Sequence, residues 1–267
     1  TMAEEYIYAV ARIKARETQL LTQQDIDRLM ACKTPADCLR ALGDKGWDTG
    51  SGKPAEAVLA AETEKTWALM RELTPDLTPF NVLLYPTDFN NLKAAIKCAV
   101  TGAEPRNVFL PGGTVPTEAV QAAVRENDFS ALPDFMAAPA AEAMQVLLST
   151  RDGQRCDTIL DRACLAAIRR AGRESRNPLI DGFAERKVAV SDIRIAIRAQ
   201  HTGKTRAFLE ESLAPCDTLD LGALTDAALK SEEALCAYLR RTDYADGVGP
   251  LQAGASAFEK WCDDRQT

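Results

Sequence analysis

Two short stretches of the sequence resemble each other, and together they decide the expected fold. Residues 88–102 read DFNNLKAAIKCAVTG, and residues 191–203 read SDIRIAIRAQHTG. Aligned without a gap, with Leu92 opposite Ile193, each copy carries apolar residues four apart, basic residues four apart and a final glycine. This pattern is typical of an amphipathic helix that ends at a C-terminal glycine. We therefore predict that the two stretches are equivalent helices.

The sequence around these two stretches also has helical periodicity. Apolar residues recur on one face of residues 6–21 and again along residues 54–73. Residues 153–200 form a nearly continuous helical pattern that is interrupted at Asn177-Pro178. No segment carries a clear alternating pattern of the kind that marks a strand. The expected fold class is therefore all-α.

Echoes between distant segments indicate an internal repeat. The stretch PCDTL at residues 215–219 resembles PGGTV at residues 111–115, and each is followed by a short predicted helix. Related units of this kind usually pack around a shared centre. We expect one all-helical domain over residues 1–267, made of three related units: residues 1–78 with 246–267, residues 79–177, and residues 178–245.

Composition excludes several classes of protein. The 267 residues include 32 Lys and Arg against 39 Asp and Glu, a net charge of −7, whereas a nucleic-acid-binding protein usually shows a basic excess. The eight cysteines form no C-x-x-C pair, and free cysteines at helix-core spacing favour a reducing cytoplasm. The uncharged runs are too short to span a bilayer, and the acidic Glu4-Glu5 does not fit a signal peptide.

The sequence lacks the residue patterns that catalysis requires. His201 is its single histidine, and it falls at an expected helix C-terminus, where a basic group favours the helix dipole. Gly112-Gly113 is not followed by the Lys of a phosphate-binding loop. Asp88 and Asp192 stand where helices are expected to start, which favours an N-cap role. We therefore expect no enzyme activity, no cofactor and no metal.

Three motifs resemble the C subunit of the V-type (A-type) ATPases, a family related to the eukaryotic membrane-sector d subunit. Residues 6–21 are similar to the family's opening Y-x-Y-A-x-x-R-x-R-x-x-E-x-x-L-L, with Lys14 in place of its second Arg. Residues 85–93 are similar to Y-x-x-D-x-x-N-L-K. Residues 192–199 are similar to D-x-x-N-x-x-x-x-x-R-A, although Ile195 stands at the Asn position. The residues that carry these motifs are Tyr6, Arg12, Glu17, Asp88, Asn91 and Asp192.

The resemblance implies a particular architecture and role. Family members form an all-helical funnel of three pseudo-symmetric units around a central cavity. The funnel sits on the membrane rotor ring and holds the foot of the central shaft, the D and F subunits, so it couples proton or sodium transport to ATP without an active site. The resemblance thus implies a cytoplasmic protein that is peripheral to the membrane through the ring.

One departure from the family pattern concerns the end of the sequence. Family members continue by some tens of residues after the stretch FEKWCD at residues 258–263, with a further helix that closes the unit begun at Tyr6. The resemblance therefore implies a fold that is incomplete at its C-terminus. A truncated chain and a naturally short member both agree with this pattern.

Four basic residues are candidates for a partner interface. Lys93 and Lys97 lie four apart in the first copy, and Arg194 and Arg198 lie four apart in the second, so each pair lines one helix face. In an acidic protein such faces could meet a partner, although charges at this spacing are also the ordinary surface of an exposed helix. The motif residues are expected to fix helix ends and contacts between units. An alternative function is a helical scaffold that binds a peptide or partner helix.

Overall fold

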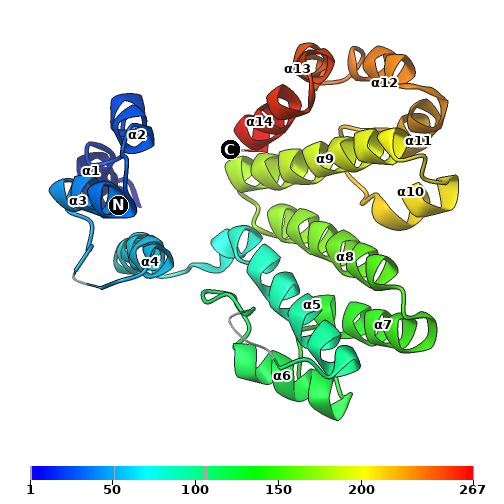
Figure 1. Cartoon of the computed structure of the whole chain (residues 1–267), viewed down its shortest axis with the longest axis horizontal. Helices are drawn as coiled ribbons and strands as arrows, with labels where there is room; N and C mark the ends of the chain where they lie inside the picture. The colour runs from blue at the N-terminus through cyan, green and yellow to red at the C-terminus, as the bar shows by residue number, and fades with distance from the viewer. Residues whose placement is uncertain (1, 51, 105–107, 267) are drawn as a thin grey trace. The chain divides into compact units, whose positions relative to one another are not determined.

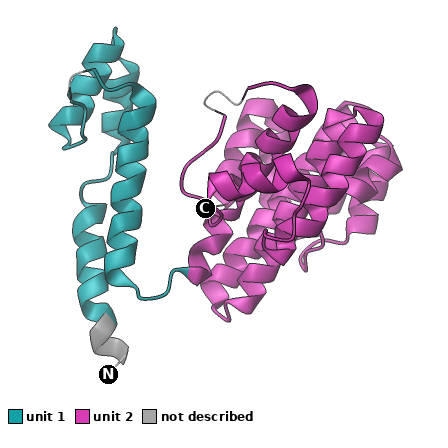
Figure 2. Cartoon of the chain, turned by 90° about the horizontal axis from the view of Figure 1, so that it is seen from below, with its two compact units in different colours: residues 1–77 teal, residues 78–267 magenta. Residues whose placement is uncertain are grey.

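The computed structural model describes residues 2–50, 52–104 and 108–266. Every regular element in these ranges is a helix, which confirms the predicted all-α fold (Figure 1). The chain forms two compact units, unit 1 at residues 1–77 and unit 2 at residues 78–267 (Figure 2).

Unit 1 contains four helices whose starts follow from local sequence. The Thr22 hydroxyl accepts a hydrogen bond from the Asp25 backbone, and the Asp25 side chain accepts one from the Thr22 backbone, a reciprocal cap. Thr34 caps the next helix, with Pro35 at its first position. The helices are α1 (Met2–Glu17), α2 (Gln23–Met30), α3 (Pro35–Asp44) and α4 (Ala55–Leu73).

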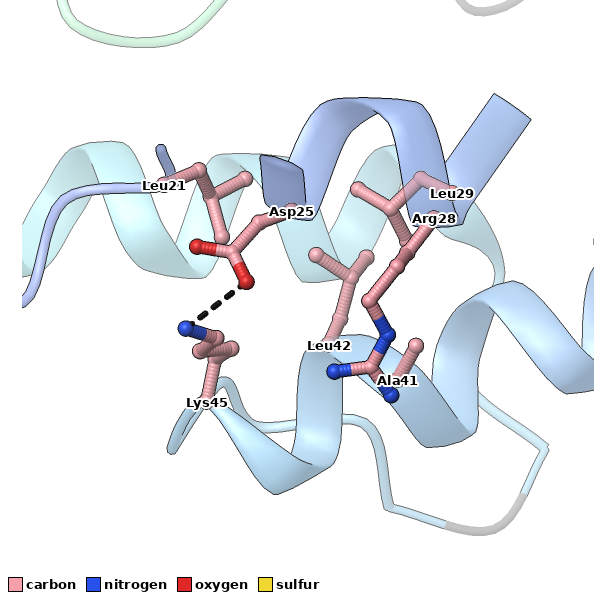
Figure 3. A pocket seen from close by; sticks show the side chains of 7 residues that line it. All are labelled: Leu21, Asp25, Arg28, Leu29, Ala41, Leu42 and Lys45. Atoms are coloured by element: carbon pink, nitrogen blue, oxygen red, sulfur yellow. Dashed lines mark ion pairs between the residues drawn. The ribbon is translucent and has the colours of Figure 1, made fainter. Parts of the chain in front are cut away.

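Ion pairs link the helices within unit 1. Lys45 at the end of α3 contacts Asp25 of α2 at 2.8 Å, beside the apolar side chains that line a small pocket (Figure 3). Hydrogen bonds from Lys45 and from Thr22 lower the pKa of Asp25 to about 2. Arg12 of α1 contacts Glu72 of α4 at 2.7 Å. The two pairs hold α2 against α3 and α1 against α4.

Unit 2 contains two successive sets of helices. The first half runs from a 3₁₀ helix, η1, to α8, and the second half runs from α9 to α14. The first half has η1 (Thr78–Leu83), α5 (Tyr85–Thr101), α6 (Thr117–Glu126), α7 (Asp134–Thr150) and α8 (Gly153–Glu174). The second half has α9 (Pro178–His201), α10 (Arg206–Ser212), α11 (Leu221–Lys230), α12 (Glu232–Leu239), η2 (Ala245–Gly247), α13 (Val248–Ala253) and α14 (Ala255–Gln266).

Proline and glycine set the boundaries of the two repeated helices. Pro86 lies in the first turn of α5, where its missing N–H costs nothing, and it separates α5 from η1. Asn177 caps α9 ahead of Pro178, which confirms the predicted interruption. Gly102 and Gly203 follow the two helices with φ of 71° and 64°, a left-handed conformation that glycine adopts without strain.

The apolar seams of the repeated stretches lie at the centre of two clusters in unit 2. Leu92 and Ile96 of α5 are fully buried in the first cluster, and Ile193 of α9 is fully buried in the second. Helices α14, α9, α8 and α7 lie side by side in this order (Figure 1). The contact between α8 and α9 therefore connects the two clusters. Each stretch thus lies in a helix with a buried apolar seam, but residues 88–102 make up most of α5, whereas residues 191–203 begin inside α9, so their equivalence stays a prediction.

The division into three related units stays a prediction. It groups residues 246–267 with the N-terminal unit, whereas in the structure their helices α13 and α14 belong to unit 2. There, α14 packs on α9.

Candidate partner-binding surface

The predicted basic residues of the first repeat pair with carboxylates across the α5–α8 contact. The Lys93 Nζ lies 2.6 Å from the Asp161 Oδ1, and the Lys97 Nζ lies 2.7 Å from Asp157. The two lysines lie one turn apart on α5, and the two aspartates lie one turn apart on α8. The two antiparallel helices are therefore joined by two successive ion pairs. We call this set ladder 1.

The second repeat contains the matching arrangement across the α9–α14 contact, which we call ladder 2. Arg194 reaches Glu259 and Asp263, each at 3.0 Å, and the Arg198 Nη2 lies 2.7 Å from the Glu259 Oε1. The Arg194 side chain is 22% exposed, whereas that of Arg198 is 66% exposed. The four predicted interface residues therefore hold helices together, and Arg198 also presents its guanidinium to solvent.

Two side chains of α5 bind the loop that leads to α6. The Asp88 carboxylate accepts hydrogen bonds from the Val115 backbone at 3.0 Å and the Thr114 hydroxyl at 2.6 Å. The Asn91 side chain accepts from the Leu110 N–H and donates to the Leu110 carbonyl, both at 2.8 Å. Among these bonds, the one from the Val115 N–H supplies a partner to a backbone donor of a buried residue. We call this set clasp 1.

Two side chains of α9 bind the corresponding loop of the second half. The Asp192 Oδ1 accepts from the Ala214 N–H at 2.9 Å, as Asn91 does from Leu110. The Glu185 Oε1 accepts from the Thr218 N–H and hydroxyl, both at 2.7 Å, which is the part that Asp88 plays in clasp 1. This set is clasp 2. Glu185 performs its part from an earlier turn of the helix and with a longer side chain.

The expectation that Asp88 and Asp192 cap helix starts is wrong: α5 begins after Leu84, and the Asp88 side chain binds the loop before α6 instead. Asp192 lies deep inside α9, whose cap is Asn177, because the helix continues through the boundary that the repeated stretch indicates. The side chain is fully buried. Burial raises the pKa of Asp192 to about 8, because the charged form loses its hydration. Burial likewise raises the pKa of Asp88, which lies in the first turn of α5.

A buried arginine connects clasp 2 to α8. Arg169 is 5% exposed, and its Nε lies 2.6 Å from the Glu185 Oε2. Its Nη2 lies 2.6 Å from Asp217, and its Nη1 contacts Asp181. The exposed Arg173 binds the same Asp217. Arg169 and Glu185 are not among the residues that the sequence singles out, because neither stands in a motif and their contacts join distant segments.

A groove of about 470 Å³ lies between the two ladders. Asp157 and Asp161 of ladder 1 and Arg198 of ladder 2 are among the residues that line it. Ile195 and Phe208 supply apolar surface, and Phe208 also lies beneath the Lys204 ammonium. The groove thus combines apolar side chains with charges of both signs, a surface suited to an amphipathic partner segment.

The remaining motif residues lie on α1. The Tyr6 side chain is 57% exposed, and Glu17 pairs with Lys14 of its own helix at 2.7 Å. Arg12 contacts Tyr8 of its own helix and Glu72 of α4. The predicted role of these residues in contacts between units stays a prediction.

The described residues show neither a metal cluster nor a membrane span. In the ranges 2–50, 52–104 and 108–266, no group of three or more potential metal-ligating side chains comes together. None of the helices in these ranges combines the length and apolarity needed to cross a bilayer. His201 contacts Glu232 at 2.6 Å, so this histidine links α9 to α12.

Similarity to known proteins identifies the family to which this arrangement belongs. The family described as ATP synthase (C/AC39) subunit matches residues 9–267, so the chain belongs to this family. The chain is 26% identical over 212 residues to the C subunit of the V-type ATP synthase of Thermus thermophilus, covering 76% of the chain. It is 21% identical over 244 residues to the C subunit of the V-type sodium ATPase of Enterococcus hirae, covering 88% of the chain and 73% of that protein.

A third relative is the C subunit of the A-type ATP synthase of Thermococcus gammatolerans, which is 23% identical over 240 residues and 85% of the chain. These matches confirm the resemblance that the sequence motifs indicate. The matched region spans 65% of the length of the Thermus relative and 64% of the Thermococcus relative.

Proposed function

We propose that this chain is a non-catalytic subunit that links the central shaft of a V/A-type ATPase to its membrane rotor ring. Family membership supports an accessory role in such a complex. The observation that carries the finer proposal is the groove between ladders 1 and 2, whose lining combines apolar side chains with charges of both signs. Its occupant is then the end of the shaft, the D and F subunits.

The proposal places the chain at the cytoplasmic face of the membrane, peripheral to the bilayer through its contact with the ring. It also assigns the three related units to a funnel around a central cavity. A coupling subunit needs neither cofactor nor metal, because its work is mechanical. Proton or sodium transport then proceeds in the ring, and ATP chemistry proceeds elsewhere in the complex.

Transmission of torque requires helices that do not slide past one another. Unit 2 contains ion pairs and hydrogen bonds that oppose such sliding. Ladder 1 joins α5 to α8, Arg169 joins α8 to α9, and ladder 2 joins α9 to α14. Clasps 1 and 2 hold the following loops to α5 and α9. A load applied at the groove would thus be shared by several helices.

Charge reversal at Arg198 tests the assignment of the groove. The R198E substitution should weaken binding of the purified D–F pair about fivefold at low salt, a loss of about 1 kcal/mol. The loss should shrink as salt rises, because exposed charges are screened within about 8 Å at physiological ionic strength. Calorimetric titration at two salt concentrations would measure both effects.

The matched control is R241E, which reverses an exposed arginine that lies just past α12 and outside the groove. It alters net charge equally, so it should change the affinity for the D–F pair much less than R198E does. Equal affinities for wild type and R198E, or equal losses in both variants, would show that the groove is not the shaft site.

A further inference from the structure

Helices α2 and α3 of unit 1 form a hairpin that is held at two places. At the open end, Asp25 of α2 pairs with Lys45 beside apolar residues (Figure 3). At the connecting loop, Cys32 follows α2 by two residues, and Cys38 lies in the first turns of α3. The short connection places these two cysteines at the same end of the hairpin.

The two thiols occupy neighbouring positions on the last turn of α2. The Cys32 Sγ donates to the Arg28 carbonyl at 3.4 Å, and the Cys38 Sγ donates to the adjacent Leu29 carbonyl at 3.6 Å. Partial burial raises the pKa of Cys32, and the neighbouring Cys38 thiol adds to this shift. Both side chains are partly exposed, so a small reagent can reach them.

We propose that Cys32 and Cys38 form a modification site, a dithiol that closes reversibly into an intramolecular disulfide. Its reaction partner is a low-molecular-weight disulfide of the glutathione class. The other six cysteines belong to unit 2, where Cys156, Cys164, Cys236 and Cys262 are buried and Cys98 and Cys216 are partly exposed. The proposal concerns unit 1 alone and does not depend on the shaft-binding role.

The reaction is a two-step thiol–disulfide exchange. The thiolate of one cysteine attacks a sulfur of the small disulfide, forms a mixed disulfide and releases one small thiolate. The second cysteine then attacks the protein-bound sulfur of the mixed disulfide and releases the second small thiolate. The protein dithiol loses two electrons and two protons, and the small disulfide gains them as two thiols. A small-molecule dithiol reverses both steps.

Formation of the Cys32–Cys38 disulfide would change the contacts at the end of α2. The two S–H groups now donate to the Arg28 and Leu29 carbonyls of the last turn, and the Leu29 carbonyl also accepts the Cys32 backbone N–H. The disulfide removes both donors and links the helices covalently. Oxidation thus replaces two weak hydrogen bonds with a crosslink between α2 and α3.

The test treats the full chain with oxidised glutathione and follows its intact mass, its free-thiol count and its disulfide-linked peptides. Wild type should lose two of its eight thiols, and its mass should fall by two hydrogen atoms. Peptide mapping should place the bond between Cys32 and Cys38. Dithiothreitol should restore all thiols, and non-reducing electrophoresis should show a single chain.

Three variants separate the proposed pair from other thiols. C32S and C38S should each retain one glutathione as a stable mixed disulfide, because the second thiol that would displace it is gone. C98S changes a partly exposed cysteine of α5 and should behave as wild type. Wild-type protein that keeps all its thiols, carries glutathione on both cysteines, or pairs either one with another cysteine would overturn the proposal.

Discussion

Replacing Arg169 by methionine should lower the free energy of unfolding of unit 2 by about 3–5 kcal/mol, the usual cost of breaking a buried ion pair from one side. The substitution keeps much of the side-chain length but removes the cation that pairs with the Glu185 Oε2. Glu185 is 8% exposed, so its charge would stay buried. Urea unfolding followed by Trp261 fluorescence, with W47F and W67F in the background, would report on unit 2.

Two further variants test the cause of this loss. R173M removes the other arginine at Asp217, but the Arg173 side chain is 55% exposed, so it should cost at most about 1 kcal/mol. The double variant R169M/E185Q should be more stable than R169M, because a neutral amide removes the unpaired buried charge. A loss for R169M no larger than that for R173M would contradict the importance of the buried network.

The second large effect is expected from D192N, which should stabilise unit 2 at neutral and alkaline pH. Asn91 occupies the corresponding place in clasp 1 and binds its loop through a neutral amide. Burial raises the pKa of Asp192 to about 8, so wild type folds with this carboxyl protonated at neutral pH. The Ala214 N–H and Arg162 act against this shift, and Glu185 acts with it. Wild type must therefore take up a proton at Asp192 when it folds at neutral pH, whereas the neutral amide of D192N needs none.

The direction of the pH dependence follows from linkage. The carboxyl of the unfolded chain ionises near pH 3.8, whereas the folded one retains its proton up to about pH 8. Between these values the folded state binds more protons, so wild-type stability falls as pH rises. The slope approaches about 1.4 kcal/mol per pH unit, so D192N should gain on the order of 5 kcal/mol over wild type between acid pH and pH 8. The difference should be smallest below about pH 4, where both states of wild type are protonated.

The reciprocal substitution N91D supplies the matched control. It places a buried carboxyl in clasp 1, so the variant should lose stability relative to wild type as pH rises over the same range. Urea unfolding at several pH values, with the same Trp261 probe, measures both variants. A constant difference between wild type and D192N from about pH 4 to pH 8 would show that Asp192 is ionised in the folded protein.

The helical fold could be predicted because its signals are local. Apolar residues four apart in α5 and α9, together with Gly102 and Gly203, identify helices with one buried face and a fixed end. The alignment of the two stretches places Leu92 opposite Ile193, and both are fully buried. Packing of this kind needs little more than the periodicity of the chain.

The polar part of unit 2 could be predicted only in part. The spacing of the basic residues identifies one side of both ladders, but their acidic partners lie 60 or more positions along the chain. Clasp 2 could not be predicted from the repeat. Glu185 binds its loop as Asp88 does in clasp 1, but it lies one turn earlier in the repeat, so a gapless alignment does not place the two residues opposite each other. The N-cap role predicted for Asp192 is wrong because the repeated stretch begins inside α9. These features depend on contacts between residues that lie far apart in the sequence, which local patterns do not determine.

Direct binding of the shaft is the measurement that tests the proposed role most directly. The full chain would be titrated with the purified D–F pair of the same complex, and the products would be resolved by size-exclusion chromatography with light scattering. We expect a complex of one chain with one D–F pair, without ATP hydrolysis by the chain alone. Separate elution of the chain and the D–F pair at micromolar concentrations, or ATP hydrolysis by the purified chain, would contradict the account.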